Sequence, residues 1–326
     1  MKFYLFLFLL VTFSTVAQRL DSKQITVNEG TNMAMALSPD GQTIAIDLQG
    51  TIYTLPAKGG VAKSLTDGMG DDRQPCWSPD GQRVAFQSYR GGTYHIWSVN
   101  KEGKDLKQHT SGPYDHREPF WGGDGSSIVC SSDRKGNYDI WKIDLSTGTA
   151  TALTTHLEHD YTPSYSPDGN TLAFASSRAN GAGIYLLLEN GTEKLLAPAG
   201  KGTPSVPAWS KDGKWISYQL LTGAETALLS VEVATGKIVP LSKTGDDVFP
   251  FRAAWEANGS ILYTTDGKIK RRGAEDGGSV EVPFQVTMTV STPVYQRKTY
   301  DFDGPSLKTV KGIRSPVVSP DGKQVA

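Results

Sequence analysis

A four-residue turn motif recurs along the chain at a nearly constant interval, and this repeat constrains the fold more than any other feature. The motif Ser-Pro-Asp-Gly stands intact at residues 38–41, 78–81, 166–169 and 319–322, with altered copies at 122–125, 210–213 and 256–259. The final glycines of successive copies are 40, 44, 44, 44, 46 and 63 residues apart. The regular intervals match the length of one four-stranded blade of a β-propeller.

The motif has the chemistry of a tight turn between two strands. Ser in the first position, Pro in the second and Gly in the fourth are residues that type I turns prefer. Each copy follows a short apolar run, such as Cys76-Trp77, and precedes a β-rich run, such as Arg83–Phe86. We therefore expect the first two strands of each blade to form a hairpin around this turn. Two further strands follow in each repeat, for example Tyr138–Ile143 and the segment after Gly148.

The repeat predicts an all-β fold, a β-propeller of four-stranded blades with six complete repeats plus the start of a seventh. The complete copies run from about Met33 to Phe284. A generic β-sandwich does not explain six copies in register. The sequence leaves open whether the closed ring has six or seven blades. The strand-like segment Gln24–Val27 is a candidate for a closing strand in the last blade.

The first residues have the three-part pattern of a secretory signal peptide. A basic start, Met1-Lys2, precedes the apolar run Phe3–Val11 and the small residues Ser14–Ala17. The run is shorter than the about 20 residues that a transmembrane helix needs. We expect residues 1–17 to be a signal peptide and the mature protein to be periplasmic or secreted, without a transmembrane segment. A retained N-terminal anchor is the alternative.

The remaining chain divides at the irregular spacing before the last motif. We expect a six-bladed propeller over residues 18–284, a connecting segment over 285–312 and a truncated further repeat over 313–326. The last hairpin would be half made, with an unpaired edge. We therefore expect the chain to be the front part of a longer protein.

Charge and cysteine content narrow the possible partners and cross-links. The formal net charge of −1 gives no reason to expect nucleic acid as a partner, because its phosphates would require a basic stripe on the protein. The only cysteines, Cys76 and Cys130, stand where other repeats carry core residues. We expect two buried free thiols, with a bridge between neighbouring repeats as the alternative.

The repeat resembles that of a known propeller family. A Pro-x-Trp-Ser-Pro-Asp-Gly turn, a β run, Ser-x-Arg and an Ile-Trp or Ile-Tyr strand, as in residues 75–97, are similar to the TolB-type propeller repeat. The resemblance covers nearly the whole mature chain. It implies the propeller fold and says little about activity, because one fold supports many functions.

A narrower resemblance concerns residues 45–56 and 282–322. Both segments are similar to the N-terminal propeller region of large exported amidohydrolase-family proteins. That resemblance implies a metal-dependent hydrolase domain after Ala326, and a metal ion only there, with no cofactor in this chain. Related propellers also precede serine peptidase domains of the prolyl-oligopeptidase and tricorn kinds.

Recognisable catalytic motifs are not found. The sequence has no Gly-x-Ser-x-Gly elbow. The segment His156-Leu157-Glu158-His159 departs from the His-Glu-x-x-His zinc pattern. The chain itself therefore carries no predicted catalytic residue.

One group of polar residues recurs at the same place in three repeats, just before the residues that open the first strand. Propeller geometry brings these loops together around one mouth of the central channel. We expect a ligand-binding rim whose acids and histidines bind a cation or polar ligand and whose arginines bind a carboxylate. A solvated rim with local turn bonds is the plainer alternative. The predicted rim residues are Asp71, Asp72, Arg73, Asp115, His116, Arg117, His159 and Asp160.

Three hypotheses for function follow. The first is a binding or substrate-gating module, recruiting a protein or peptide partner or serving a covalently following hydrolase domain of the amidohydrolase type. The second places an enzymatic site at the rim itself, as in propeller lyases or glycosidases. The third is a stand-alone TolB-like envelope protein that acts in protein–protein assembly, or the propeller of a serine peptidase. The sequence favours the first.

Overall fold

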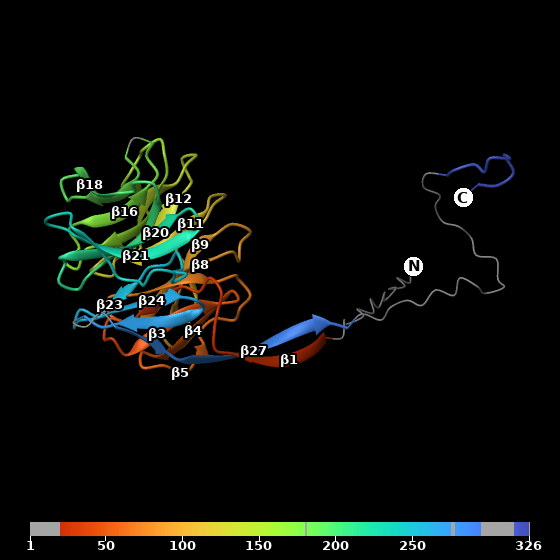
Figure 1. Cartoon of the computed structure of the whole chain (residues 1–326), viewed down its shortest axis with the longest axis horizontal. Coiled ribbons are helices and arrows are strands. Elements are labelled where there is room, and N and C mark those ends of the chain that lie inside the picture. The colour runs from red at the N-terminus through yellow and green to blue at the C-terminus, as the bar shows by residue number, and fades with distance from the viewer. Residues whose placement is uncertain (1–19, 180, 275–277, 295–315, 326) are drawn as a thin grey trace, which may run out of the picture. The chain divides into compact units, whose positions relative to one another are not determined.

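The computed structural model describes residues 20–179, 181–274, 278–294 and 316–325 (Figure 1). Within these residues the regular secondary structure consists of β-strands. The chain divides into two compact units. One is Gln24–Met288, and the other combines Met1–Lys23 with Thr289–Ala326. The described residues contain no helix with the length and hydropathy needed to span a bilayer.

The larger unit contains six four-stranded antiparallel sheets, called blades 1 to 6 in chain order. Blade 1 contains β2 (Met35–Leu37), β3 (Thr43–Leu48), β4 (Thr51–Pro56) and β6 (Lys63–Ser64). Blade 2 contains β7 (Arg73–Trp77), β8 (Arg83–Ser88), β9 (His95–Asn100) and β10 (Lys107–Gln108). Blade 3 contains β11 (His116–Trp121), β12 (Ser127–Ser132), β13 (Asp139–Asp144) and β14 (Ala150–Ala152).

The second half of the ring repeats this plan. Blade 4 contains β15 (Asp160–Tyr165), β16 (Leu172–Ser176), β17 (Gly183–Leu187) and β18 (Glu193–Pro198). Blade 5 contains β19 (Thr203–Trp209), β20 (Trp215–Thr222), β21 (Glu225–Glu232) and β22 (Ile238–Pro240). Blade 6 contains β23 (Ala254–Trp255), β24 (Ile261–Thr265), β25 (Lys268–Arg272) and β26 (Ser279–Val282).

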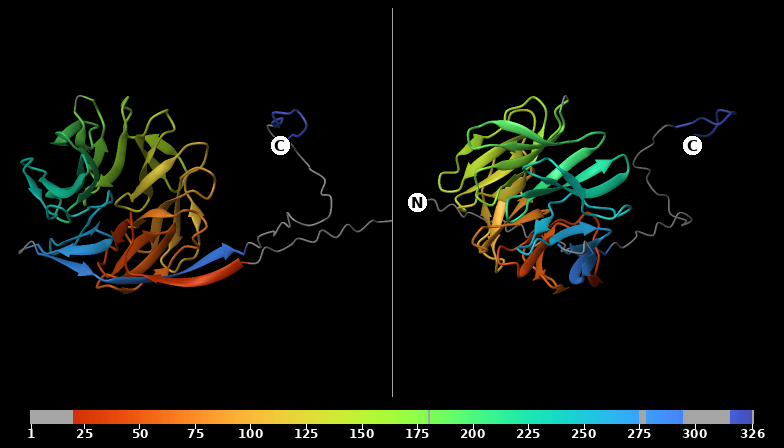
Figure 2. Two further views of the ribbon diagram at one scale, coloured as in Figure 1. Left: turned by 45° about the vertical axis from the view of Figure 1, so that its right-hand side comes forward. Right: turned by 60° about the vertical axis from the view of Figure 1, so that its left-hand side comes forward.

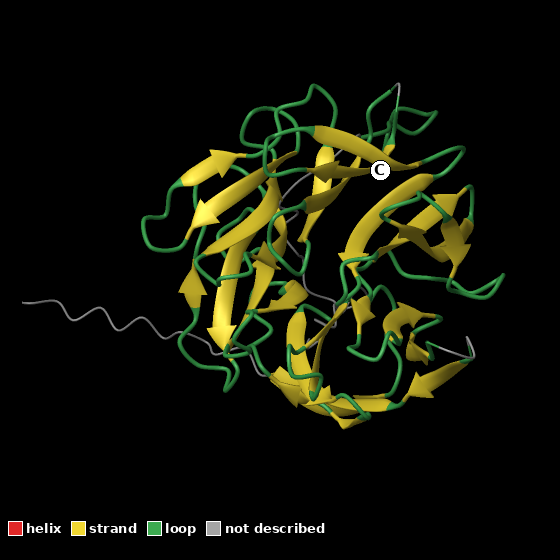
Figure 3. Ribbon diagram, turned by 90° about the vertical axis from the view of Figure 1, so that its left-hand side faces the viewer, coloured by secondary structure: helices red, strands yellow, loops and turns green. Residues whose placement is uncertain are grey.

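The first strand of each blade lies on the inside of a ring. Contacts run from β2 through β7, β11, β15 and β19 to β23, and β23 contacts β2. Figure 3 shows the sheets arranged around a common centre, and Figure 2 gives two further views. The predicted all-β propeller of four-stranded blades is confirmed, and the described residues form a ring of six.

The repeated motif forms the predicted turn. In the first copy, the N–H of Gly41 donates to the carbonyl of Ser38 at 2.9 Å, and the N–H of Thr43 donates to the Ser38 hydroxyl at 2.9 Å. Gly41 has a φ of 70°, a left-handed conformation that glycine adopts without steric cost. The fourth position of the motif is therefore glycine for a backbone reason.

Apolar faces of neighbouring blades pack together and form the core. Ile46 of blade 1 belongs to one buried cluster with Leu262 and Ile269 of blade 6. Cys76 and Cys130 belong to one cluster between blades 2 and 3. Both cysteines are buried and free, as the sequence predicts.

A bulge interrupts the inner strands of blades 2 to 5 at the residue that precedes a proline in each of these repeats. These residues have left-handed φ angles of 53°, 60°, 56° and 53° at Gln74, Glu118, Thr162 and Val206. A non-glycine residue in this conformation is uncommon and is held by its surroundings. The N–H of Gln74 donates to Asp47 of blade 1 at 2.7 Å, and the N–H of Glu118 donates to Gln87 of blade 2 at 2.9 Å. Hydrogen bonds between blades therefore fix the inner strands.

The prediction that residues 24–27 add a closing strand to the last blade is wrong. The N-terminal strand β1 (Leu20–Val27) pairs with β27 (Phe284–Pro293), which in turn pairs with β5 (Gly60–Val61). Phe284 lies opposite Gly60 in a parallel register, and the hydroxyls of Thr26 and Thr287 are 2.9 Å apart. The outer edge of blade 6 belongs to β26 instead. Blades 6 and 1 are joined by the shared apolar cluster and by backbone bonds, in which the N–H of Gly60 donates to the carbonyl of Pro283 at 2.9 Å and the N–H of Ala62 to that of Gln285 at 2.8 Å.

Two predicted segments fall partly or wholly outside the described residues. Residues 1–17, the predicted signal peptide, lie outside them, as do residues 295–312 of the predicted connecting segment. The seventh copy of the motif forms the same turn, in which the N–H of Gly322 donates to the carbonyl of Ser319 at 2.8 Å.

Candidate functional site

The predicted rim residues lie at the start of the inner strands of blades 2, 3 and 4, at three consecutive repeat positions. Successive side chains of a strand point to opposite faces. The middle residues of the three triplets, Asp72, His116 and Asp160, are 0%, 1% and 0% exposed. The structure therefore divides the predicted rim into a buried set and a surface set. The surface set is Asp71, Arg73, Asp115, Arg117 and His159.

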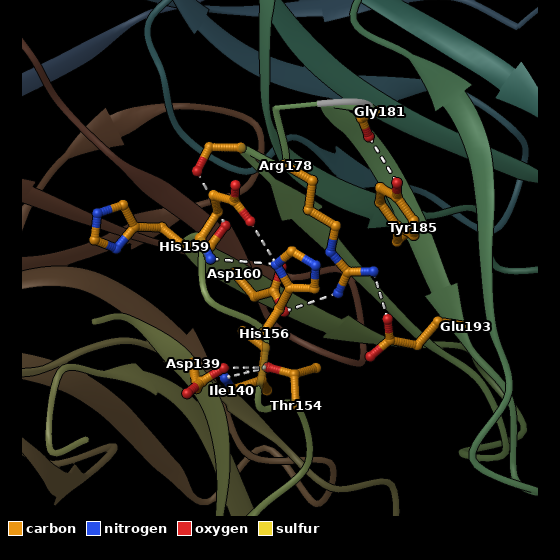
Figure 4. Close-up of polar contacts among 12 residues, drawn as sticks. Asp139, Ile140, Thr154, His156, His159, Asp160, Arg178, Gly181, Tyr185 and Glu193 are labelled. Atoms are coloured by element: carbon orange, nitrogen blue, oxygen red, sulfur yellow. Dashed lines mark hydrogen bonds and ion pairs between the residues drawn. The ribbon is translucent and has the colours of Figure 1, made fainter. Parts of the chain in front are cut away.

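In blade 4 the buried acid holds an arginine (Figure 4). Asp160 forms an ion pair with Arg178 at 3.1 Å, and Arg178 also pairs with Glu193 at 2.5 Å. The guanidinium lies 4.5 Å from the ring centre of Tyr185. Burial alone would lower the pKa of Arg178, but the two carboxylates outweigh it and raise the pKa. Asp160 thus serves the packing of blade 4.

Blade 2 contains the same arrangement. Asp72 pairs with Arg90 at 2.8 Å, and Arg90 also pairs with Asp67 at 2.5 Å. Arg90 and Arg178 occupy the arginine position of the Ser-x-Arg part of the repeat. In each acid Oδ2 pairs with the arginine and Oδ1 has no hydrogen-bond partner among the described residues, so Asp72 and Asp160 lie inside their blades and not on the surface.

Blade 3 departs from this arrangement because His116 replaces the acid. Its ring lies 5.5 Å from the ring of His95, and its Nδ1 has no hydrogen-bond partner among the described residues. Burial, with the nearby His95 and Arg134, lowers the pKa of His116 to about 4. Arg134, at the arginine position of this repeat, lies over the rings of Trp141 and Tyr114 at 4.8 and 5.6 Å instead.

The surface set forms a continuous series of contacts across the blades. Arg73 pairs with Asp71 at 2.8 Å, and the hydroxyl of Tyr94 donates to Asp71 at 2.6 Å. The guanidinium of Arg117 lies 4.5 Å from the centre of the Tyr94 ring and pairs with Asp115 at 2.6 Å. Blades 2 and 3 are thereby linked at the surface.

The series continues into blade 4. The hydroxyl of Tyr138 donates to Asp115 at 3.3 Å, and the Tyr138 ring lies 5.9 Å from the ring of His159. The N–H of Tyr138 donates to Nδ1 of His159 at 3.1 Å. We call this series the mouth ladder; it comprises Asp71, Arg73, Tyr94, Asp115, Arg117, Tyr138 and His159.

Hydrogen bonds keep the acids of the mouth ladder charged. Burial alone would raise the pKa of Asp71, but bonds from Tyr94 and Arg73 lower it below its ordinary value. The pKa of Asp115 is lowered in the same way, against burial, by bonds from the N–H of Tyr94 and from Arg117. Burial raises the pKa of Tyr138 to about 12, so its hydroxyl keeps its proton. The ladder thus presents alternating fixed charges and phenols.

Exposed apolar side chains lie in the same loops as residues of the ladder or in the loops next to them. Met69, Tyr89 and Leu157 are 81%, 50% and 92% exposed, and each lies in a loop that precedes an inner strand or joins a second strand to a third. The Tyr89 ring meets the Tyr94 ring edge-on at 5.2 Å. Together with the ladder these three side chains form what we call the mouth surface.

The sequence did not indicate the tyrosines or the apolar residues of this surface. Tyr94 and Tyr138 stand 44 residues apart, at the same position of consecutive repeats. An alignment of the repeats by their third strands would have identified this pair. Met69 and Leu157 stand 88 residues apart, twice that spacing, at the same position of blades 2 and 4, whereas Tyr89 shares no such spacing and needed the structure.

An arginine from blade 6 reaches across the ring. Arg252 donates to the carbonyl of Pro163 in blade 4 at 3.0 Å and to that of Pro119 in blade 3 at 3.5 Å. Its guanidinium lies 5.1 Å from the centre of the Phe120 ring. Burial lowers the pKa of Arg252, with Cys76 and Glu118 opposing. The side chain therefore connects the segment before β23 of blade 6 to the inner strands of blades 3 and 4.

The described residues contain no group of three or more His, Cys, Asp or Glu side chains that could hold a metal ion. The mouth ladder combines carboxylates, guanidinium groups and phenols, which can bond to a polar ligand or to a partner surface.

Comparisons with known proteins agree with this architecture. The family model described as the TolB beta propeller domain matches residues 11–117 and 107–274. A curated relative, an uncharacterized protein of Agrobacterium fabrum, is 36% identical over 73 residues, which is 21% of this chain and 25% of the relative. The chain thus matches about a quarter of that relative's length.

Solved structures show the same fold at low identity. TolB from Acinetobacter baumannii is 20% identical with a TM-score of 0.62, over 78% of this chain and 66% of that one. Oligogalacturonate lyase from Vibrio parahaemolyticus is 13% identical with a TM-score of 0.54, over 94% of both chains. The tricorn protease is 12% identical with a TM-score of 0.55, over 86% of this chain and 36% of that one.

Proposed function

The chain belongs to the TolB β-propeller family, and we propose that it is a binding module whose mouth surface docks a protein or peptide partner. The proposal places the partner on blades 2 to 4. The predicted signal peptide supports a site of action in the periplasm or outside the cell. No step of catalysis is assigned to the chain.

The mouth ladder carries this proposal. The side chains of Asp71, Arg73 and Arg117 are 38%, 44% and 38% exposed, yet each is held by an ion pair. Side chains fixed before binding lose little conformational freedom when a partner arrives. Tyr, Met and Arg are enriched in protein interfaces, and the mouth surface combines all three. Such a surface fits a folded partner or an extended peptide.

Substrate gating for a following hydrolase domain is the second candidate. The resemblance of residues 45–56 and 282–322 to exported amidohydrolases supports it, and so does the small share of the tricorn protease that the chain covers. In this candidate any metal ion belongs to the following domain. Passage through the ring would require Arg252 to leave the carbonyls of Pro119 and Pro163. Docking at the mouth requires no such movement, and we favour it.

Co-purification tests the docking proposal. The tagged protein is expressed with its export signal and isolated with its bound partner, as wild type and as the double variant Arg73→Ala/Arg117→Ala. We expect the double variant to lose the partner and to keep its melting temperature within a few degrees, because both arginines are surface groups. Equal recovery of the partner by both proteins would refute docking at the mouth.

A further inference from the structure

A tryptophan stands in blade 5 at a position where the other five blades do without one. Trp215 begins the second strand of its blade and is half-buried. Because five blades fold with a smaller or a charged side chain here, the fold does not require Trp215. The equivalent residues are Thr43, Arg83, Ser127, Thr171 and Ser260.

Trp215 lines a groove between blades 5 and 6 at the end of the inner strands opposite to the mouth surface. The groove has a volume of about 450 Å³, within the range of small-molecule sites. The half-buried Trp255 of blade 6 and Val239 of blade 5 line it as well, and the buried side chains of Leu241 and Ile261 lie beneath them. Two indoles and an apolar lining thus meet in one groove.

The indole N–H of Trp255 is already used inside the fold. It donates to the carbonyl of Ala208 at 3.2 Å and to the hydroxyl of Ser217 at 3.0 Å. Trp255 therefore offers its ring to a ligand and no hydrogen-bond donor. Stacking on the apolar face of a ligand needs only this ring.

Polar side chains of both signs border the groove. Asp212 accepts the N–H of Lys214 at 3.1 Å, and Glu256 pairs with Arg271 at 3.1 Å, so both carboxylates are fixed. Asn258 and Arg272 line the same groove. Carboxylates accept hydrogen bonds, guanidinium groups donate, and an amide does both. This border matches a ligand that carries many hydroxyls and no net charge.

We propose that the groove between blades 5 and 6 binds a neutral oligosaccharide. The apolar C–H face of a sugar ring stacks on Trp215 and Trp255, and its hydroxyls bond to Asp212, Asn258 and Arg272. The site is distinct from the mouth surface and does not depend on the proposed partner docking.

The equivalent groove between blades 2 and 3 is a built-in control. It has a volume of about 610 Å³, but Arg83, Lys107 and His109 replace Trp215, Val239 and Leu241. Arg83 is held by Asp105 at 2.8 Å, and burial lowers the pKa of His109 to about 4. This groove keeps one indole, Trp121, whose ring meets the His109 ring edge-on at 6.4 Å, and it has no second indole for a stacked sugar.

The test is a glycan array of neutral oligosaccharides probed with the full chain, followed by calorimetric titration of the best ligand. We expect binding by the wild type and a loss of about tenfold or more in affinity for Trp215→Thr, the residue found in blades 1 and 4. Trp215→Phe keeps an aromatic face and is expected to lose about threefold or less. The matched change Arg83→Thr is expected to bind like the wild type.

Three results would overturn the proposal. The first is an array without binding to any neutral glycan. The second is a Trp215→Thr variant that is folded by its circular dichroism and binds as tightly as the wild type. The third is an equal loss for Arg83→Thr, which would place the ligand elsewhere.

Discussion

Blades 2 to 4 and blade 5 have the same backbone at the channel mouth and different side chains on it. Val206 of blade 5 has a φ of 53°, like Gln74 of blade 2, and each stands at a bulge of the inner strand. The positions that carry Asp71 and Arg73 in blade 2 carry Thr203 and Ser205 in blade 5. Ser205 turns its hydroxyl to Gln219 at 3.0 Å, within its own blade. The bulge belongs to the fold, and the mouth ladder is an addition to three blades.

A second difference lies within the three blades themselves. The buried acids of blades 2 and 4 hold arginines, whereas blade 3 has His116 at that position. The inner strand forms in all three cases. The inner strand therefore accepts either an acid paired with an arginine or a histidine at this buried position. The mouth ladder crosses blades of both kinds.

Removal of a buried acid is expected to have the largest effect. Asp160→Ala leaves Arg178, whose side chain is 13% exposed, with Glu193 alone. Loss of one partner of a buried pair costs about 3 kcal/mol in free energy of unfolding. The matched change Asp115→Ala at the surface should cost about 1 kcal/mol or less. Urea unfolding of both variants measures this, and equal costs would abolish the distinction between the two sets.

Acid is expected to destabilise blade 3 through His116. Its pKa falls from an ordinary 6.5 to about 4 in the fold, so the unfolded chain binds the proton first. Stability is complete above pH 6.5 and is lost as the pH falls toward 4, by about 2 kcal/mol at pH 5. His109 shares this sign, so the variant His116→Gln isolates the contribution. A wild type and a His116→Gln variant with parallel stability curves between pH 7 and pH 5 would contradict the prediction.

The apolar part of the mouth surface should contribute to partner affinity. Tyr89→Ala removes a ring that is 50% exposed, and we expect an affinity about tenfold lower, close to 1.4 kcal/mol. The matched change in blade 5 is Leu221→Ala, at a residue 41% exposed, and it should have no effect. Titration of the isolated partner against both variants measures the two affinities. A larger loss for Leu221→Ala would move the interface to blade 5.

The phenols of the ladder are expected to have the smallest effect. Tyr94→Phe removes a 2.6 Å bond to Asp71, and Tyr138→Phe removes a 3.3 Å bond to Asp115. We expect a loss of about 1 kcal/mol for the first and about 0.5 kcal/mol for the second in free energy of unfolding. Urea unfolding of both variants gives the order of the two losses, and a reversed order would show that the bond from Tyr138 is the stronger of the two.

The sequence was sufficient for the blades because each one is specified locally. The glycine turn and the apolar strands recur in each copy at a nearly constant interval. A correct assignment of the strands in one repeat therefore applies to the others. The closing strand was misplaced because the alternation of Gln24–Val27 marks a strand without naming its neighbour. That neighbour, β27, is set by packing far along the chain.

The sequence predicted where the candidate site lies, but it did not predict which of its side chains are at the surface and which are buried. Adjacent residues such as Asp71 and Asp72 look alike in sequence, and only the direction of the strand separates a surface acid from a buried one. The partners of the buried acids, Arg90 and Arg178, lie 18 residues away in each case. Contacts between strands therefore decided what the pattern alone left open.

Site-specific photo-cross-linking tests the central claim most directly. A photoreactive residue replaces Leu157, 92% exposed at the mouth surface, or Leu221, 41% exposed on blade 5, in the exported protein. The account predicts a partner adduct at Leu157 that disappears with Arg73→Ala/Arg117→Ala, and none at Leu221. An adduct at Leu221 alone, or one at Leu157 that survives the loss of both arginines, would contradict docking on the mouth surface of blades 2 to 4.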